Sequence, residues 1–124
     1  MSIQSVILIV ISVMLTSSAQ LLMKNGMSSA AVQDALSYKP FMTASLTIAT
    51  SPSVMLGLLS FAMSAAVWLL VLSRLDVSQA YPFVALGIAI TVIAGQLLFG
   101  EHMSAFRAFG IILIIAGVIF IAVN

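Results

Sequence analysis

Apolar residues gather along this chain into four long blocks, at about residues 3–23, 52–73, 78–99 and 105–123. A helix needs roughly 20 residues to cross the 30 Å hydrocarbon core of a bilayer, and each block has about that length. Membrane-spanning strands would alternate apolar and polar residues, which the block from Gly110 to Ala122 does not do. The pattern predicts an all-α fold, with a single integral membrane domain over residues 1–124 built as a four-helix transmembrane bundle.

Composition supports a chain whose solvent is lipid. Hydrophobic residues make up 63% and charged residues 6% of the 124 positions, whereas an ordinary soluble domain carries about 25% charged residues. With no cysteine and one histidine, the chain offers neither a disulfide nor a zinc-binding set. We expect no cofactor, no metal site, no catalytic activity and no nucleic-acid partner.

Turn and capping residues mark the ends of the predicted spans. Ser51-Pro52 is typical of an N-cap followed by proline in the first turn, and Ser104 can cap the last span. Asp76 with Gln79 resembles a capping box, and Gly26 is expected to end the first helix. The short stretches between the second, third and fourth spans predict tight turns between antiparallel helices.

The segment from residue 25 to 51 is expected to be a loop with short amphipathic helices at the membrane interface, interrupted at Pro40. Basic residues bias the orientation of the chain. Lys24, Lys39 and Arg107 flank one side of the predicted membrane, against Arg74 on the other. Positive charge favours the cytoplasm, so we expect the long loop inside and both termini outside, by a margin small enough to leave dual insertion open.

Four polar residues of the first span recur every fourth position: Ser12, Thr16, Gln20 and Lys24. On a helix this spacing makes one continuous stripe. Lipid disfavours such a stripe, so we expect it to face the protein interior or a wet cavity. Two interpretations stay open, namely hydrogen bonds between helices, worth about 0.6–1 kcal/mol each, and the lining of a substrate path.

Small residues form a second kind of stripe. Gly87, Thr91 and Gly95 are spaced by four, and Gly110 and Gly117 by seven. Small residues at such spacings let helix backbones approach closely, so these faces are predicted to pack against other helices. Because four thin helices enclose little space, we expect a dimer, either of two copies or with a similar small subunit.

Three further residues near the span ends are candidates for substrate contact. Tyr81 precedes a proline at the start of the third span and is either an interfacial anchor or part of a cavity wall. Glu101 follows the end of that span, where the helix dipole disfavours a carboxylate. It could pair with Arg107, with His102 or with a substrate cation. Arg107, like Lys24, could equally extend into the headgroup layer.

Four motifs in order give the chain a family resemblance. The stretches Ala19 to Lys24, Ala80 to Pro82, Phe99 to Glu101 and Gly110 to Val118 resemble the drug/metabolite transporter superfamily, and the size resembles its small multidrug resistance branch. In the drug exporters of that branch a mid-span glutamate binds protons or an organic cation. The matching position here is Thr16, and the position of the cation-stacking aromatic is Val84. Both departures remove the chemistry of drug–proton exchange.

The chain is more similar to the flippase subunits for undecaprenyl-phosphate-linked aminoarabinose. The shared features are the Gln20-x-x-x-Lys24 pattern, Ala80-Tyr81-Pro82 and Glu101. The resemblance implies a multi-pass transporter of the bacterial inner membrane that moves a polyprenyl-phosphate-linked sugar or related lipid between leaflets, often as a pair of small subunits. Export of small cations or metabolites, and a non-transporting subunit of a glycolipid-pathway complex, remain alternatives.

Overall fold

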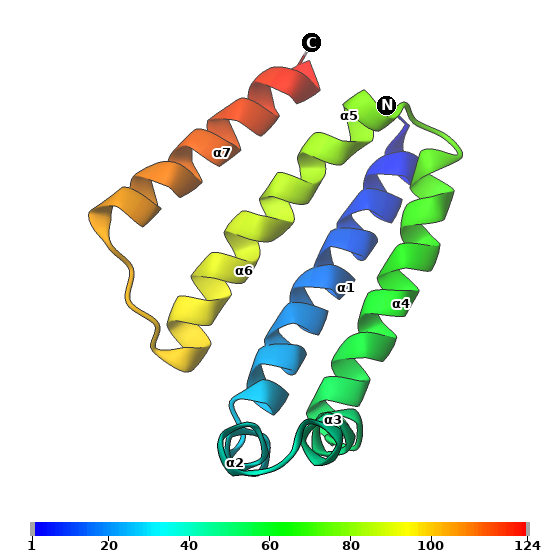
Figure 1. The fold of residues 1–124 in the computed structure, drawn as a ribbon. Helices are drawn as coiled ribbons and strands as arrows, with labels where there is room; N and C mark the ends of the chain where they lie inside the picture. Colours follow the sequence, from blue (N-terminus) through cyan, green and yellow to red (C-terminus); the bar gives the residue numbers. More distant parts are fainter. Residues whose placement is uncertain (1, 124) are drawn as a thin grey trace.

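The computed structural model describes residues 2–123, which form seven α-helices and one 3₁₀ turn with no strand in that range (Figure 1). The all-α prediction is therefore confirmed. The elements are α1 (Ile3–Met27), α2 (Ala30–Tyr38), α3 (Phe41–Ala49), α4 (Pro52–Leu72), α5 (Val77–Ala80), η1 (Tyr81–Phe83), α6 (Val84–Phe99) and α7 (Ala105–Val123).

Four segments of the described chain are long and apolar enough to cross a bilayer. They are α1, α4, the continuous run α5–η1–α6 and α7, with 25, 21, 23 and 19 residues. The chain is a multi-pass membrane protein. Within the third span, Pro82 lies in the 3₁₀ turn, so the N–H that proline lacks is not missed from a regular α-helical ladder.

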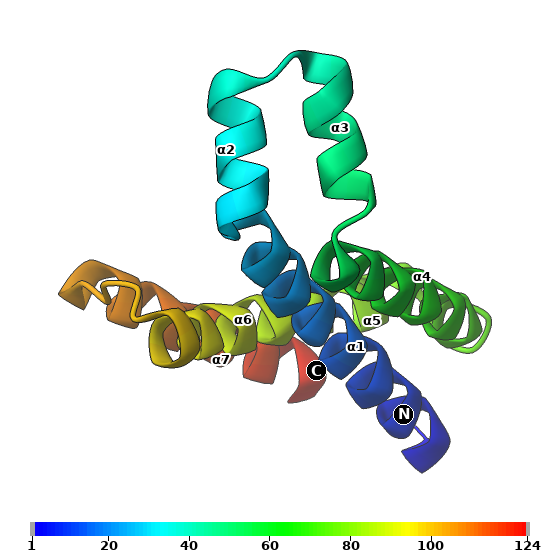
Figure 2. The ribbon, with the colours of Figure 1, turned by 90° about the horizontal axis from the view of Figure 1, so that it is seen from below.

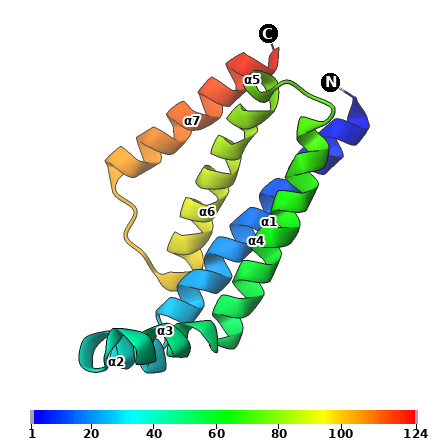
Figure 3. The ribbon, with the colours of Figure 1, turned by 45° about the vertical axis from the view of Figure 1, so that its right-hand side comes forward.

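The bundle is built on an antiparallel pair, α1 and α4, which lie side by side in Figures 1 and 3. Glycines allow the close approach. A Cβ on Gly57 would lie 3.0 Å from both the Ala19 carbonyl oxygen and the Met23 amide nitrogen. A Cβ on Gly26 would lie 2.9 Å from the Val54 amide nitrogen. The expectation that Gly26 ends the first helix was wrong, because α1 continues to Met27 and this glycine serves the contact with α4.

The third span packs on α1, while α7 lies at the edge of the bundle, with its main contacts to α6 and η1. Figures 1 and 3 show α7 spreading away from α6 toward the connector 100–104. Gly100 enters this connector with a φ of 65°, a conformation that glycine adopts without strain. The connector 100–104 is therefore an extended link between α6 and α7, and not the tight turn that was predicted.

Of the predicted loop 25–51, residues 25–27 continue α1, and the remainder is a helical hairpin, α2–α3, divided at Pro40. It runs across the spans: Figure 1 shows both helices end-on, whereas Figure 2, from below, shows them along their length beside the bundle. Two predicted caps lack a side-chain hydrogen bond. Ser51 takes the N-cap position before Pro52, but its hydroxyl makes no capping bond. Asp76 precedes α5, but its side chain makes no capping hydrogen bond, so the expected capping box with Gln79 does not form.

Ser104 does cap α7, since its hydroxyl accepts a hydrogen bond from the Arg107 amide at 3.2 Å. We expect Ser104→Ala to destabilise the first turn of α7 by roughly 0.5–2 kcal/mol, because that N–H loses its acceptor. Hydrogen exchange in proteoliposomes should become faster at Arg107. Ser37→Ala, on the exposed side of α2, is the control. Unchanged exchange at Arg107 would mean that water or headgroups replace the cap without cost.

Candidate functional site

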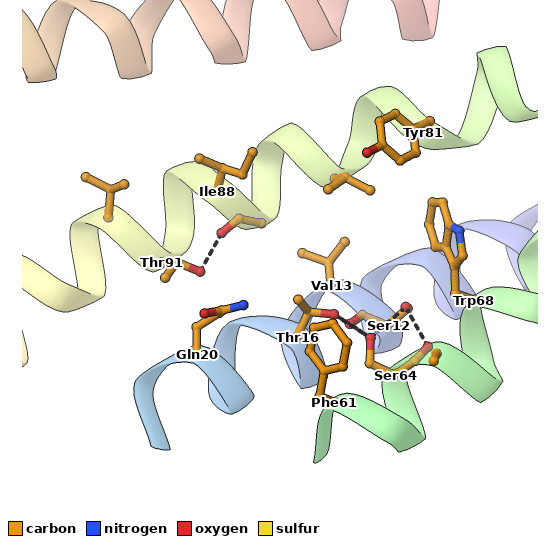
Figure 4. A pocket seen from close by; sticks show the side chains of 14 residues that line it. Ser12, Val13, Thr16, Gln20, Phe61, Ser64, Trp68, Tyr81, Ile88 and Thr91 are labelled. Carbon is orange, nitrogen blue, oxygen red and sulfur yellow. Dashed lines mark hydrogen bonds between the residues drawn. The ribbon is translucent and has the colours of Figure 1, made fainter. Parts of the chain in front are cut away.

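A cavity of about 450 Å³ lies between α1, α4 and the η1–α6 segment (Figure 4). Its walls are mostly apolar, with polar groups concentrated on α1. The lining residues are Ser12, Val13, Thr16, Gln20, Phe61, Ser64, Ala65, Trp68, Tyr81, Val84, Gly87, Ile88, Thr91 and Val92. The volume is within the range of about 300–1,000 Å³ that is typical of small-molecule sites.

Three hydroxyls join α1 to α4 at the floor of this cavity. The Ser64 hydroxyl donates to the Ser12 carbonyl oxygen at 2.9 Å, and the Ser12 hydroxyl donates to the Ser64 carbonyl oxygen at 3.1 Å. The Thr16 hydroxyl donates to the Ser12 carbonyl oxygen at 3.0 Å and also contacts the Ser64 hydroxyl. The polar stripe therefore serves interhelical bonding and cavity lining together.

Gln20 is the most adaptable polar group of the cavity. Its side chain is exposed in the chain alone and extends from α1 toward α6. Opposite it, the Thr91 hydroxyl donates to the Gly87 carbonyl oxygen at 2.8 Å, which satisfies that donor within α6. An amide offers both a donor and an acceptor, so Gln20 can bind a ligand hydroxyl or carbonyl where the serines are already engaged.

Aromatic rings form much of the remaining wall. Phe61 and Trp68 come from α4, and Tyr81 comes from η1 (Figure 4). Trp68 both packs against the buried cluster around Ile9 and Val71 and lines the cavity. Such rings give a ligand an apolar surface on which to stack.

Sequence reasoning assigned no residue of α4 to the site, and so missed Phe61 and Ser64. A helical signal for them exists, because Phe61, Ser64 and Trp68 are spaced by three and four and share one face of α4. Ser17 was also missed. Its hydroxyl donates to the Gly87 carbonyl oxygen at 3.3 Å and ties α1 to α6.

Of the seven predicted substrate residues, the structure gathers Ser12, Thr16, Gln20 and Tyr81 around the cavity. The other three lie outside its lining. Lys24 is exposed in the last turn of α1. The Glu101 carboxylate lies over Gly95, with Oε2 3.2 Å from where a Cβ would stand. Arg107 donates from Nη1 to the His102 carbonyl oxygen at 2.9 Å.

The small-residue stripes divide in a similar way. A Cβ on Gly87 would lie 3.2 Å from Val13 Cγ1, so this glycine permits the contact between α6 and α1. Thr91 faces the cavity, and Gly95 is covered by the connector through Glu101. Around Gly110 and Gly117 nothing in the described chain would come within 4 Å of an added Cβ. Their face on α7 is thus open in a single copy.

The cavity lining carries no carboxylate, no amine and no imidazole. It offers hydroxyls, an amide and aromatic surface to a ligand. Over residues 2–123, no three His, Asp or Glu side chains stand together as a metal-binding group.

Comparison with known proteins places this arrangement in a family. The Small Multidrug Resistance protein family model matches residues 41–114, from α3 into α7. The chain belongs to the Small Multidrug Resistance protein family. No solved structure matches the chain.

Curated proteins with similar sequences carry the name probable 4-amino-4-deoxy-L-arabinose-phosphoundecaprenol flippase subunit ArnE. The protein of Pseudomonas fluorescens (strain Pf0-1) is 40% identical over 68 residues, 55% of this chain and 60% of the relative. The protein of Pseudomonas aeruginosa (strain UCBPP-PA14) is 36% identical over 69 residues, which are 56% of this chain and 60% of the relative. The protein of Serratia proteamaculans (strain 568) is 35% identical over 69 residues, which are 56% of this chain and 60% of the relative. The chain thus spans about 60% of the length of these relatives.

Proposed function

We propose that this protein is a subunit of a flippase that carries a polyprenyl-phosphate-linked sugar, or a related amphipathic lipid, across the bacterial inner membrane. The observation that carries the proposal is the cavity between α1, α4 and α6, where hydroxyls and the Gln20 amide lie among aromatic rings. Sugars present hydroxyls on their edges and C–H groups on their faces, and this wall complements both. The names of the curated relatives support the same substrate class.

Phosphate recognition is assigned to one end of the bundle. Lys24 lies in the last turn of α1, which leads into the α2–α3 hairpin, and Arg107 lies in the first turn of α7, beyond the connector that follows α6. Both side chains are exposed. Cations at headgroup depth attract a lipid-linked phosphate, and the isoprenoid tail can remain in the surrounding acyl chains. The cavity then needs to hold only the sugar.

The working unit is proposed to be a pair of small subunits. The face of α7 around Gly110 and Gly117 is open in one copy, and small residues at a seven-residue spacing fit against another helix. A second subunit on this face, either a copy or a similar small protein, would add helices around the path. Co-purification at equal stoichiometry in native nanodiscs, tested with Gly117→Leu, would measure this pairing.

Gln20→Ala is expected to slow the crossing of a lipid-linked sugar at least about fivefold, because removing a polar partner in an apolar cavity costs about 1–3 kcal/mol. The measurement is the transfer of polyprenyl-phosphate-sugar between leaflets of vesicles containing the intact subunit pair. Leu59→Ala, on the exposed side of α4, is the matched truncation control. Lys24→Ala should instead weaken binding, with partial recovery at higher lipid concentration. Undiminished crossing by Gln20→Ala would remove the cavity from the mechanism.

Family membership favours one other function, export of organic cations or metabolites. Cation export needs a carboxylate, and the nearest one along the third span is Glu101, whose side chain lies over Gly95 rather than in the cavity lining. Uptake of a hydrophobic cation into acid-loaded vesicles separates the two functions. Uptake that is lost in Glu101→Gln, together with no crossing of lipid-linked sugar, would select the exporter.

A further inference from the structure

The α2–α3 hairpin is the part of this protein that the four-span architecture does not require. It joins the end of α1 to the start of α4, and its first helix precedes the region that the family model matches. Its two nine-residue helices run across the spans at one end of the bundle. Because the spans cross the bilayer, a hairpin in this position lies along the membrane surface rather than projecting from it.

Large apolar side chains of the hairpin face away from the bundle. Tyr38 is 86% exposed, Phe41 87% and Met42 70%, and these three residues surround the tip at Pro40. Leu36 and Leu46 continue the exposed apolar surface along α2 and α3. Val32, Ala35 and Ala44, in contrast, are buried within the hairpin and against the bundle. The outer surface therefore needs an apolar occupant.

Three of the four hydroxyl side chains of α3 and its C-cap bond back to the helix, an arrangement that suits an environment poor in water. The helix carries no charged residue. Ser45 donates to the Phe41 carbonyl oxygen at 2.9 Å, Thr47 to the Thr43 carbonyl oxygen at 2.9 Å, and Thr50 to the Leu46 carbonyl oxygen at 2.8 Å. Hydroxyls that bond back to their own helix need no water, which is how serine and threonine are accommodated in lipid.

We propose that the α2–α3 hairpin is a lipid-binding element that lies in the interfacial layer of the bilayer, with Phe41 and Met42 among the upper acyl carbons and Lys39 at the headgroups. Aromatic side chains beside a lysine are the composition that membrane interfaces select. The occupant of the exposed surface is thus the bilayer itself, continuous with the lipid around the spans. Anchored in this way, the hairpin holds the Lys24 end of α1 and the first turn of α4 at headgroup depth.

The absence of cysteine from the sequence makes a direct test available. Single variants Phe41→Cys, Met42→Cys and Asp34→Cys carry a nitroxide in vesicles of phosphatidylethanolamine and phosphatidylglycerol at 7:3. Leu59→Cys, on the exposed face of α4, reports the lipid interior. We expect the ratio of oxygen to nickel-chelate collisions at Phe41 and Met42 to lie between the ratios at Leu59 and Asp34, and at least threefold above that at Asp34.

Two results would overturn the proposal. Nickel-chelate collisions at Phe41 and Met42 as frequent as at Asp34 would place the tip in water. Spin–spin broadening at these positions that disappears on dilution with unlabelled protein would show that a second copy, and not lipid, covers the surface. All labelled positions are exposed, so the variants are expected to fold, and an unchanged circular dichroism spectrum would verify this.

Discussion

Gly57→Ala and Gly26→Ala are each expected to lower the free energy of unfolding by roughly 1–2 kcal/mol. Overpacking a well-packed contact costs about 1–3 kcal/mol, whereas alanine regains up to about 1 kcal/mol of helix propensity over glycine. The new methyl group at Gly57 would meet the backbone of α1 at 3.0 Å, and that at Gly26 would meet the backbone of α4 at 2.9 Å. Backbone atoms cannot rotate away as a side chain can, so α1 and α4 must separate.

The measurement is reversible unfolding by SDS in mixed micelles. Gly117→Ala is the matched control, because nothing in the described chain stands within 4 Å of its added methyl group. At protein concentrations low enough to keep the subunit monomeric, it should leave the unfolding free energy unchanged or raise it slightly. A loss at Gly117 that grows with protein concentration would report a contact between subunits, whereas the losses at Gly57 and Gly26 should not depend on concentration. Equal and small changes in the unfolding free energy at all three glycines would contradict the close contact between α1 and α4.

The spans could be predicted because bilayer thickness fixes the length of an apolar run, and the sequence of this chain meets that length four times. The close contact between α1 and α4 could not be predicted. Gly57 is the only glycine of α4, and although Ser53 stands four residues before it, this spacing does not say which helix packs against that face. Its close neighbours, Ala19 and Met23, belong to another helix, and periodicity along one helix carries no information about the register of two.

The candidate site shows the same division. Ser12, Thr16 and Gln20 could be assigned to an interior face because three polar residues on one stripe are costly in lipid. Ser64 has a second serine, Ser60, one turn earlier, but only its bonds to Ser12 show which helix this face meets. The positions of the charged residues beyond the span ends depend on the path of the connecting backbone, which helical spacing does not describe. Glu101 turns back over Gly95 because Gly100 adopts a positive φ, which no spacing rule foretells.

Thr16→Glu is expected to slow the crossing of lipid-linked sugar near pH 8 at least about tenfold relative to Thr16→Gln. Thr16 lies midway along α1, next to the Ser12–Ser64 hydroxyl pair. An ionised carboxylate at this depth costs about 2.5–3.5 kcal/mol, more than the roughly 1.4 kcal/mol of a tenfold change. It would also repel a phosphate-bearing substrate. Thr16→Gln has the same size without the charge, so it separates charge from bulk.

The pH dependence of the variant distinguishes this explanation from simple misfolding. As pH falls, the introduced carboxylate takes up a proton and becomes neutral like the glutamine amide, so crossing by Thr16→Glu should rise toward that of Thr16→Gln. The parent protein should change less than about twofold between pH 6 and 8, because its cavity lining holds no carboxylate or imidazole. A parent rate that follows pH steeply would instead place a titrating group on the path, with Glu101 and His102 of the connector as the first residues to replace.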